Sequence, residues 1–251
     1  MAAVFAQNYL TYAMDIGQRM LQYGAEVGRV EDSISRICRA YGAVRVDVFT
    51  ITSSIVVTAF DAKGQAFTQT RRVGTLVYDL SKLCELNALS RRMCMARPAD
   101  AQVCRALARI DALAHYPFRQ SVLLYAMISA AFSVFFGGSA ADAAGSAAIG
   151  AVICFLQAGL KKLNINTLFS VLVCSMVGGL GAHLLAALSI ADSAANVSIG
   201  NVMLLIPGLA LTNSIRDLFS GDTISALLRF AEALVASIAI ACGFALPAAL
   251  F

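Results

Sequence analysis

The sequence predicts an α-helical polytopic membrane domain of about five transmembrane helices, preceded by an N-terminal α+β domain. The chain of 251 residues is 59% hydrophobic and only 14% charged, with a mean hydropathy of +0.75. That composition is far too apolar for an ordinary soluble domain. Charge is also uneven, because residues 1–119 hold 15 of the 19 Lys and Arg and 10 of the 15 Asp and Glu. The second half contains apolar segments close to the ~20 residues that cross a bilayer.

The uneven charge predicts a domain boundary near Pro117. We expect an α+β domain over residues 1–117 and a transmembrane helical domain over residues 118–251. The formal charge of +4 is modest and gives no reason to expect a nucleic-acid partner. Seven Cys occur without a C-x-x-C pair, so we expect small packing residues in a reduced environment. Asp15 and Arg19 interrupt the N-terminal segment, so we expect no cleavable signal peptide there.

The first half alternates helical and extended patterns. Apolar residues at helical spacing predict two helices that stop near Gly24 and Gly42. Alternating residues predict three strands, and a turn at Lys63 and Gly64 joins the last two as a hairpin. Two more helices follow. The expected ranges are 9–21 and 27–41 for the first helices, 44–50, 55–60 and 65–70 for the strands, and 76–95 and 98–115 for the last helices.

The second half contains five candidate membrane spans. They lie at about 120–136, 140–160, 167–190, 196–214 and 224–247. Basic residues mark the connections at Arg119, at Lys161 and Lys162, and at Arg216, whereas the connections at 137–139 and 191–193 contain none. Because basic connections favour the cytoplasm, we expect the N-terminal domain in the cytoplasm and the C-terminal residue Phe251 outside.

The fourth segment contains a helix break at Pro207 and Gly208. Proline removes an amide donor and clashes with the preceding turn, and glycine permits unusual torsions. Freed backbone groups must meet protein or water in a membrane, and transporters often build binding sites at such breaks. Asn201, Gly208 and Thr212 share one face of this segment, and Asn213 follows directly. The alternative is a kinked structural helix, since Pro and Gly are common in membrane helices.

The fifth segment carries Arg229 and Glu232 on one face. An unpaired charge at a helix centre costs roughly 2.5–3.5 kcal/mol on insertion scales, so each charge needs a partner. Their spacing lets them pair with each other, and Asp217 or Asp222 could also reach Arg229. In a functional interpretation Arg229 attracts a substrate carboxylate and Glu232 tunes that attraction. In a structural interpretation the two form an ion pair, with Arg229 extending to the membrane interface.

Other polar residues favour structural roles or exclude chemistries. Asp142 and Ser146 begin a stripe of small or polar residues that permits close helix contact, with Asp142 at the water interface. His183 is expected at a helix contact, and His115 lies at the domain junction. The sequence has no H-E-x-x-H, G-x-S-x-G or G-x-x-x-x-G-K-[ST] motif. We therefore expect no metal, no cofactor, no catalytic residue and no ATP-driven pump, so transport would use a gradient.

Several short motifs resemble the threonine/serine exporter family. They are Gly24-Ala25-Glu26, Arg29-Val30-Glu31, Tyr41-Gly42, the strands from Thr50 to Thr58, Thr70-Arg71, Ile206-Pro207-Gly208, Asn213, Arg216-Asp217, Gly221-Asp222 and Arg229. The resemblance covers nearly the whole chain. The length is similar to the split form, in which a larger subunit works with a separately encoded, shorter membrane subunit. The resemblance implies export of threonine and serine, or of succinate by a split bacterial pair, and it assigns no substrate residues.

Residues and resemblance together predict the larger subunit of an exporter of small polar metabolites in a bacterial inner membrane. Threonine/serine-type amino acids come first as substrates and C4-dicarboxylates such as succinate second. The expected partners are the bilayer, a small polar carboxylate substrate and a second membrane subunit in an oligomer. The candidate substrate-binding residues are Asn201, Pro207, Gly208, Thr212, Asn213, Arg229 and Glu232, supported by Asp142, Ser146, Arg216, Asp217 and Asp222. The alternative is a membrane-anchored ligand-sensing or regulatory protein.

Overall fold

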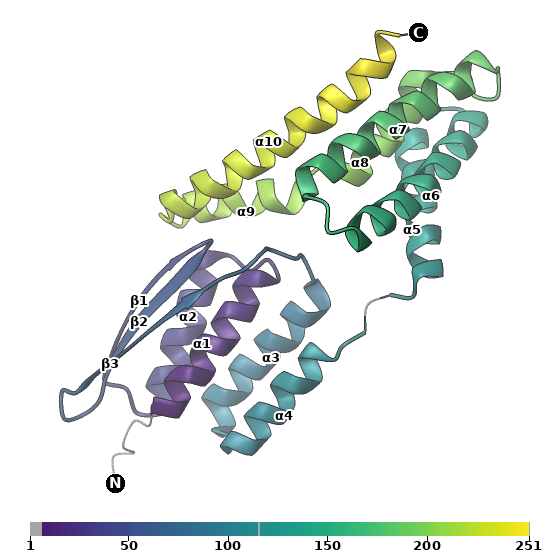
Figure 1. Cartoon of the computed structure of the whole chain (residues 1–251). Helices are drawn as coiled ribbons and strands as arrows, with labels where there is room; N and C mark the ends of the chain where they lie inside the picture. The colour runs from purple at the N-terminus through teal and green to yellow at the C-terminus, as the bar shows by residue number, and fades with distance from the viewer. Residues whose placement is uncertain (1–6, 115, 251) are drawn as a thin grey trace. The chain divides into compact units, whose positions relative to one another are not determined.

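The computed structural model describes residues 7–114 and 116–250, so His115 and Phe251 lie outside the described residues. Within these ranges the chain is mostly helical and contains one three-stranded sheet (Figure 1). The elements are α1 (Gln7–Gln22), α2 (Val27–Ala40), β1 (Arg45–Ile51), β2 (Ser54–Phe60), β3 (Ala66–Arg72), α3 (Leu80–Ala96), α4 (Asp100–Asp111), α5 (Phe118–Phe135), α6 (Ala140–Lys162), α7 (Thr167–Ala187), α8 (Ala194–Leu205), α9 (Gly208–Phe219) and α10 (Thr223–Ala248).

The chain forms two compact units. The first joins the N-terminal elements, through Ala114, with Leu209–Ala231. The second joins the chain from α5 to Gly208 with the part of α10 that begins at Glu232. Helix α9 and the first turns of α10 therefore pack with the N-terminal elements, although they follow them by about two hundred residues in the sequence. The domain boundary expected at Pro117 stays a prediction.

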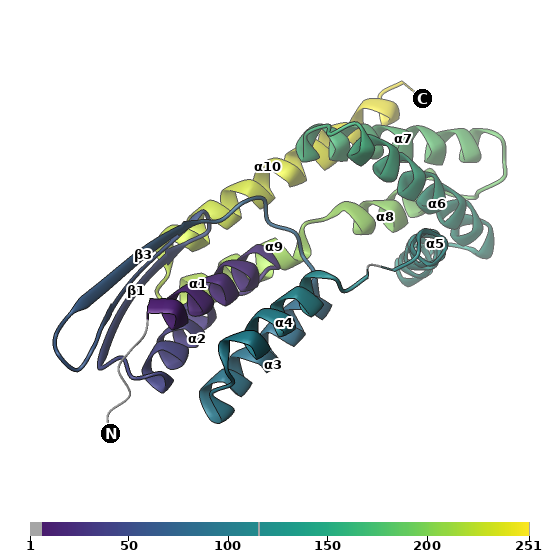
Figure 2. The ribbon, with the colours of Figure 1, turned by 60° about the horizontal axis from the view of Figure 1, so that its bottom comes forward.

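The sheet of the first unit is antiparallel in the order β1-β2-β3, which confirms the expected strands and hairpin. Ile55, Val57 and Ala59 alternate along β2 and are fully buried, because a strand presents every second side chain to the same face. They join an apolar core with α1 and α2. Figure 1 and Figure 2 show the sheet on one side of α1 and α2, with α3 and α4 on the other side.

The ends of the N-terminal helices follow local capping. Gly24 and Gly42 have φ values of 97° and 104° and end α1 and α2, as expected. The expected start of the third helix near Leu76 was wrong, because the Asp79 side chain accepts the Lys82 N–H at 3.0 Å and α3 starts after this cap. The fourth helix also ends at Asp111, earlier than expected.

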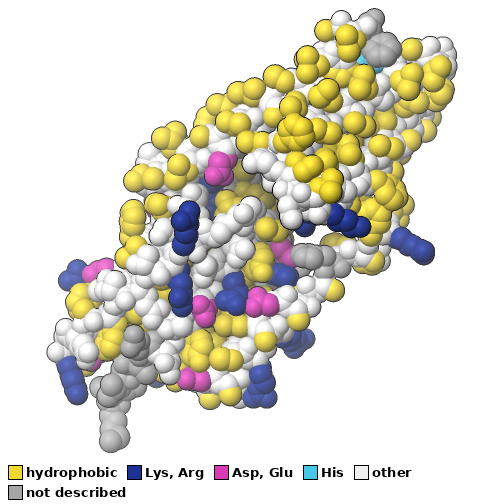
Figure 3. All heavy atoms as spheres, viewed as in Figure 1, with side chains coloured by type: hydrophobic (Ala, Val, Ile, Leu, Met, Phe, Trp, Pro, Cys, Tyr) yellow, Lys and Arg dark blue, Asp and Glu magenta, His cyan; other side chains and the backbone are white. Residues whose placement is uncertain are grey.

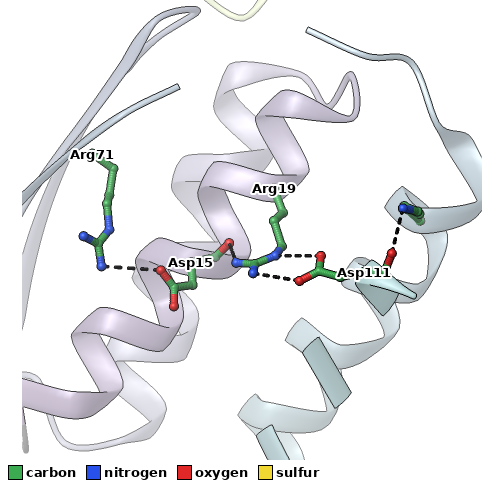
Figure 4. Close-up of polar contacts among 5 residues, drawn as sticks. Asp15, Arg19, Arg71 and Asp111 are labelled. Carbon is green, nitrogen blue, oxygen red and sulfur yellow. Dashed lines mark hydrogen bonds and ion pairs between the residues drawn. The ribbon is translucent and has the colours of Figure 1, made fainter. Parts of the chain in front are cut away.

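A network of charged side chains ties the elements of this unit together (Figure 4). Arg19 on α1 donates two hydrogen bonds to the Asp111 carboxylate at 3.0 and 2.9 Å. Asp15, one turn earlier, accepts from Arg71 of β3 at 3.4 Å, and Lys82 of α3 donates to the Asp111 carbonyl at 3.1 Å. The side chains of the two ion pairs, Arg19–Asp111 and Arg71–Asp15, are partly exposed, so each pair contributes little stability and the network mainly fixes orientation.

The membrane helices agree with the expected number. In the described chain α5, α6, α7 and α10 are each long and apolar enough to cross a bilayer. Helices α8 and α9 reach that length and hydropathy only as one interrupted span, which gives up to five. The interruption lies where Pro207 and Gly208 predicted it. In Figure 3 hydrophobic side chains cover these helices, whereas charged side chains gather over the N-terminal elements.

Small residues allow the membrane helices to approach closely. A Cβ at Gly243 of α10 would collide with Ser175 of α7. A Cβ at Gly150 of α6 would lie 2.5 Å from Ser129 Oγ of α5. Helix association in lipid depends on close contact, since lipid and apolar side chains are equally apolar. These glycines therefore hold the helices of the second unit together.

Candidate functional site

The candidate site is built around a tight turn between α1 and α2, residues 24–28, here named the α1–α2 turn. Gly24 has a φ of 97°, and a Cβ at this position would lie 2.5 Å from the Tyr78 ring. Only glycine fits this conformation and this space. The turn leaves the first N–H groups of α2 without partners inside the helix. Those groups and two carbonyls of the turn are satisfied by residues from the other end of the chain.

Two side chains from α9 and α10 bind the carbonyls of the α1–α2 turn. Asn213 Nδ2 donates to the Gly24 carbonyl at 2.9 Å, and Arg229 Nη2 donates to the Ala25 carbonyl at 2.8 Å. Asn213 is 8% exposed and Arg229 is 1% exposed. Buried backbone carbonyls require partners, and bonds from a charged donor are the stronger kind. These two side chains therefore fix the turn against α9 and α10.

Two carboxylates cap the start of α2 from the same side. Glu26 occupies the N-cap position and makes no side-chain cap. Instead the Val27 N–H donates to Asp217 Oδ1 at 3.1 Å, and the Gly28 N–H donates to the Asp222 carboxylate. Negative groups are favourable at this end of a helix, because its N–H groups carry partial positive charge. Side chains about 190 residues away thus replace a local cap.

Two ion pairs surround the turn. Arg229 Nε lies 3.1 Å from Asp217 Oδ2, and both side chains are almost fully buried. The Nε–H is not aligned for a hydrogen bond with that oxygen, and Nη1 has no hydrogen-bond partner in the described chain. The attraction is therefore mainly electrostatic in a low-dielectric setting. Arg216 Nη1 pairs with Glu26 Oε1 at 2.5 Å in a more exposed position.

Beside the turn lies a cavity of about 190 Å³. Its lining includes the side chains of Glu26, Arg29, Leu80, Leu83, Leu209, Asn213 and Arg216. Three leucines give it an apolar part, while two guanidinium groups and one carboxylate give it a charged part. Leu209 is the second residue of α9, directly after the helix break. The cavity therefore brings residues of the α1–α2 turn and of α3 together with α9, all within the first unit.

Two half-buried carboxyl groups near the turn, Glu31 and Asp222, have altered pKa values. Burial raises the pKa of Glu31, and the neighbouring Asp222 charge raises it further. The hydrogen bond that the Thr50 N–H donates to Glu31 at 2.7 Å lowers this pKa and offsets only part of the rise. Burial also raises the pKa of Asp222, in the connection before α10, and the Gly28 N–H opposes that rise. Both groups therefore resist ionisation more than exposed carboxyls do.

Five of the predicted site residues come together at the α1–α2 turn. They are Asn213, Arg216, Asp217, Asp222 and Arg229. The ion-pair partner of Arg229 is Asp217. The sequence had suggested Glu232 as this partner, with Asp217 and Asp222 as alternatives. Glu232 is exposed, three residues further along α10, and Thr212 is exposed on α9. The substrate roles of all these residues stay predictions.

Asn201 and Ser146 meet in a hydrogen-bonded cluster between α5, α6 and α8. Asn201 is fully buried, accepts from Ser129 Oγ at 2.9 Å, and donates to the Val197 carbonyl at 2.9 Å and to Ser146 Oγ at 3.2 Å. Ser146 in turn donates to the Ser129 carbonyl at 3.1 Å. The Asn201 side chain thus has partners on both its oxygen and its nitrogen, which suits a contact between helices.

Asp142, in the first turn of α6, binds the backbone of the connection between α7 and α8. Its Oδ1 accepts the N–H groups of Asp192 and Ser193, each at 2.8 Å. Its Oδ2 accepts the Ser139 N–H at 3.0 Å, which completes a capping box at the start of α6. Asp142 is 1% exposed. These bonds anchor two connections to one helix end.

Glu26, Arg29 and Tyr78 all line the cavity, although none of them was among the predicted site residues. One signal was present, since Glu26 and Arg216 have opposite charge and belong to two motifs of the same resemblance. Among the described residues no three His, Cys, Asp or Glu side chains form a metal-binding group.

Four uninterrupted apolar helices and one interrupted pair, counted over residues 7–114 and 116–250, define this chain as a multi-pass membrane protein. A comparison with protein families matches residues 11–251 to the model of the putative threonine/serine exporter. The chain therefore belongs to the threonine/serine exporter family, a family of membrane transporters. Comparisons with curated proteins and with solved structures gave no match.

Proposed function

We propose that this chain is the larger subunit of a two-component, gradient-driven exporter of small polar metabolites. Threonine/serine-type amino acids are the first substrates and C4-dicarboxylates such as succinate the second. The observation that carries the proposal is the interrupted α8–α9 span, whose second half lines a cavity with Asn213 and Arg216. Interrupted helices provide backbone and side-chain groups at membrane depth for a polar substrate.

The position of the interruption supports a substrate path past Pro207 and Gly208. A Cβ at Gly208 would meet no atom within 4 Å, so open space adjoins the break. In this proposal Thr212 and Asn213 line the path, and Glu232 acts on it as a charged group. Arg229 contributes by holding the Ala25 carbonyl and Asp217. Asn201, Ser146 and Asp142 support the path by holding their helices and connections in place.

A second membrane subunit is supported by the number of spans. Transporters commonly consist of two structural repeats with opposite orientation in the membrane. Up to five spans is an odd number and cannot divide into two equal halves. We infer that a shorter membrane protein completes the transporter. We place the exporter in the inner membrane, and the basic connections favour an orientation with residues 1–115 in the cytoplasm.

Flux measured in liposomes tests the function. The chain would be reconstituted alone, with the second subunit, and as an empty-liposome control, each with labelled serine, threonine and succinate inside. We expect efflux only with both subunits, and loss of efflux when a protonophore or ionophore removes the imposed gradient. Full flux by the single chain would contradict the two-component proposal. Substrate binding without any flux by the pair would favour the ligand-sensing alternative.

A further inference from the structure

We propose that the cavity beside the α1–α2 turn binds the carboxylate group of a small metabolite, with Arg29 and Arg216 as the cationic partners. This inference rests on the proposed function and assigns its binding site. It adds residues of the N-terminal domain to a site that the sequence placed only in the membrane helices. The charges of the cavity, its size and its position each support it.

The lining of the cavity carries an uncompensated positive charge. Arg29 lies in the first turn of α2, where the partial positive charge of the helix end disfavours a cation. Its side chain is exposed, and no ion pair or hydrogen bond involves it within residues 7–114 and 116–250. Glu26 is already paired with Arg216. The cavity lining therefore carries one more positive than negative charge, which suits an anionic group.

The nearby carboxylates do not supply the missing partner. Asp217 accepts the Val27 N–H and lies against Arg229. Asp222 accepts the Gly28 N–H. Because these acids are committed to the start of α2, they stabilise the turn and leave Arg29 to a ligand. Arg229 is a positioning residue in this arrangement, since it holds the Ala25 carbonyl and Asp217.

The size of the cavity suits a small metabolite. A water molecule occupies about 30 Å³ in the liquid, so the cavity of about 190 Å³ has room for roughly six. Pockets for drug-sized ligands measure about 300–1,000 Å³. The cavity is therefore smaller than the pocket of a drug-sized ligand and suits a compact metabolite such as serine, threonine or succinate. Leu80, Leu83 and Leu209 offer an apolar wall for a methyl or methylene group.

The cavity lies where two distant segments of the chain meet. Glu26 and Arg29 belong to the N-terminal domain, whereas Leu209, Asn213 and Arg216 follow the helix break. A ligand held by Arg29 and Arg216 would contact both segments at once. Binding would therefore add contacts between the α1–α2 turn and α9, beyond those of Asn213 and Arg229.

Binding to the purified chain tests the inference. Calorimetry would measure affinity for serine, threonine and succinate in wild type, Arg29→Gln, Arg29→Lys and Arg39→Gln. Arg39 is an exposed cation near the other end of α2, so its variant matches the change in charge. We expect Arg29→Gln to weaken binding roughly tenfold, the loss of one charge-assisted contact, with partial recovery in Arg29→Lys and no change in Arg39→Gln. Equal affinities of Arg29→Gln and Arg39→Gln, or no binding by wild type, would overturn the proposal.

Glu26→Gln distinguishes the two sources of the carboxylate. This variant frees Arg216 from its ion pair, so a dicarboxylate should bind more tightly. An amino acid should bind less tightly, because its ammonium loses the Glu26 carboxylate. If neither ligand class responds, Arg216 is not a ligand partner and the two-cation site is wrong. Flux by the wild-type pair separates the two proposals: flux with unchanged binding in Arg29→Gln refutes only the cavity, and binding without flux refutes only the exporter.

Discussion

At the scale of single residues, Arg229 shows how a charge can be buried in this protein. Its guanidinium group bonds a backbone carbonyl and faces Asp217, and both side chains are inaccessible to water. Burying two charges is expensive, and their attraction offsets this only when the geometry is good. Removing one partner leaves the other charge buried without compensation. The α1–α2 turn can therefore pack against α9 and α10 only when both members of this pair are present.

We predict that Arg229→Gln destabilises the chain by about 3–5 kcal/mol, because it strands the Asp217 carboxylate. The melting temperature and the amount of folded protein in detergent would measure this loss. Arg229→Gln/Asp217→Asn should recover most of it, since the carbonyl oxygen of the introduced amide would still accept the Val27 N–H.

Glu232→Gln is the matched control for this pair. Glu232 is exposed on the same helix, so we expect a change within about 0.5 kcal/mol. If Arg229→Gln/Glu232→Gln recovered stability and Arg229→Gln/Asp217→Asn did not, the partner of Arg229 would be Glu232.

Glu31 predicts a dependence of stability on pH. Because its pKa is raised in the folded chain, the folded state binds a proton more tightly than the unfolded state. Its favourable contribution is complete below the unfolded pKa and is lost as the pH rises through the raised folded pKa. Melting temperatures from acidic to neutral pH should therefore change less with pH in Glu31→Gln than in wild type. Asp32→Asn, at an exposed neighbouring position, should behave like wild type.

At the scale of elements, the sequence predicted the helix ends that depend on neighbouring residues, and it misplaced those that depend on tertiary contacts. Adjacent Pro207 and Gly208 disfavour a continuous helix through local chemistry alone, so the break could be located from two residues. The start of α3 was misplaced, because the apolar pattern before Leu80 is compatible with a helix. In the structure Val77 N–H donates to the Gln22 carbonyl at 2.7 Å and holds this stretch against α1 instead. Such a tertiary contact has no signature in a single sequence.

The break itself gives a prediction at this scale. Gly208→Leu should stiffen the chain directly after Pro207, since leucine has the higher helix propensity by about 1 kcal/mol, and should fill the open space at the break. We expect it to lower efflux by the two-subunit exporter severalfold or more. The amount of inserted protein should not change, since a Cβ at Gly208 meets no atom within 4 Å.

Gly159→Leu is the control for the break. Gly159 lies on α6 with equally open space around a Cβ, so this variant should keep both insertion and efflux. Equal efflux by the two variants would show that the break at Gly208 is unimportant for transport.

At the scale of the whole molecule, the number of spans followed from hydropathy, whereas the candidate site did not. Sequence placed Arg216, Asp217 and Arg229 in a membrane site, and the structure bonds them to residues 24–28. The two segments are about 190 residues apart, so no periodicity connects them. Complementary charge in Glu26 and Arg216 was the one available indication.

Topology is the prediction at this scale. We expect fusions of alkaline phosphatase at Gly138 and Asp192 to be active in the periplasm, because their connections contain no basic residue. A fluorescent protein fused after Met95 should report the cytoplasm. Phosphatase activity from the Met95 fusion would reverse the proposed orientation.

The distance along the chain between the α1–α2 turn and its partners has a consequence for biosynthesis. Ribosomes add about 5–20 residues per second, so the 190 residues from Val27 to Asp217 take roughly 10–40 s to synthesise. During that time α1, α2 and the sheet can fold, but the first N–H groups of α2 have only water as partner. The turn is completed last, after α9 and α10 have left the ribosome. The α1–α2 turn therefore reaches its final structure only after α9 and α10 of the nascent chain have packed against it.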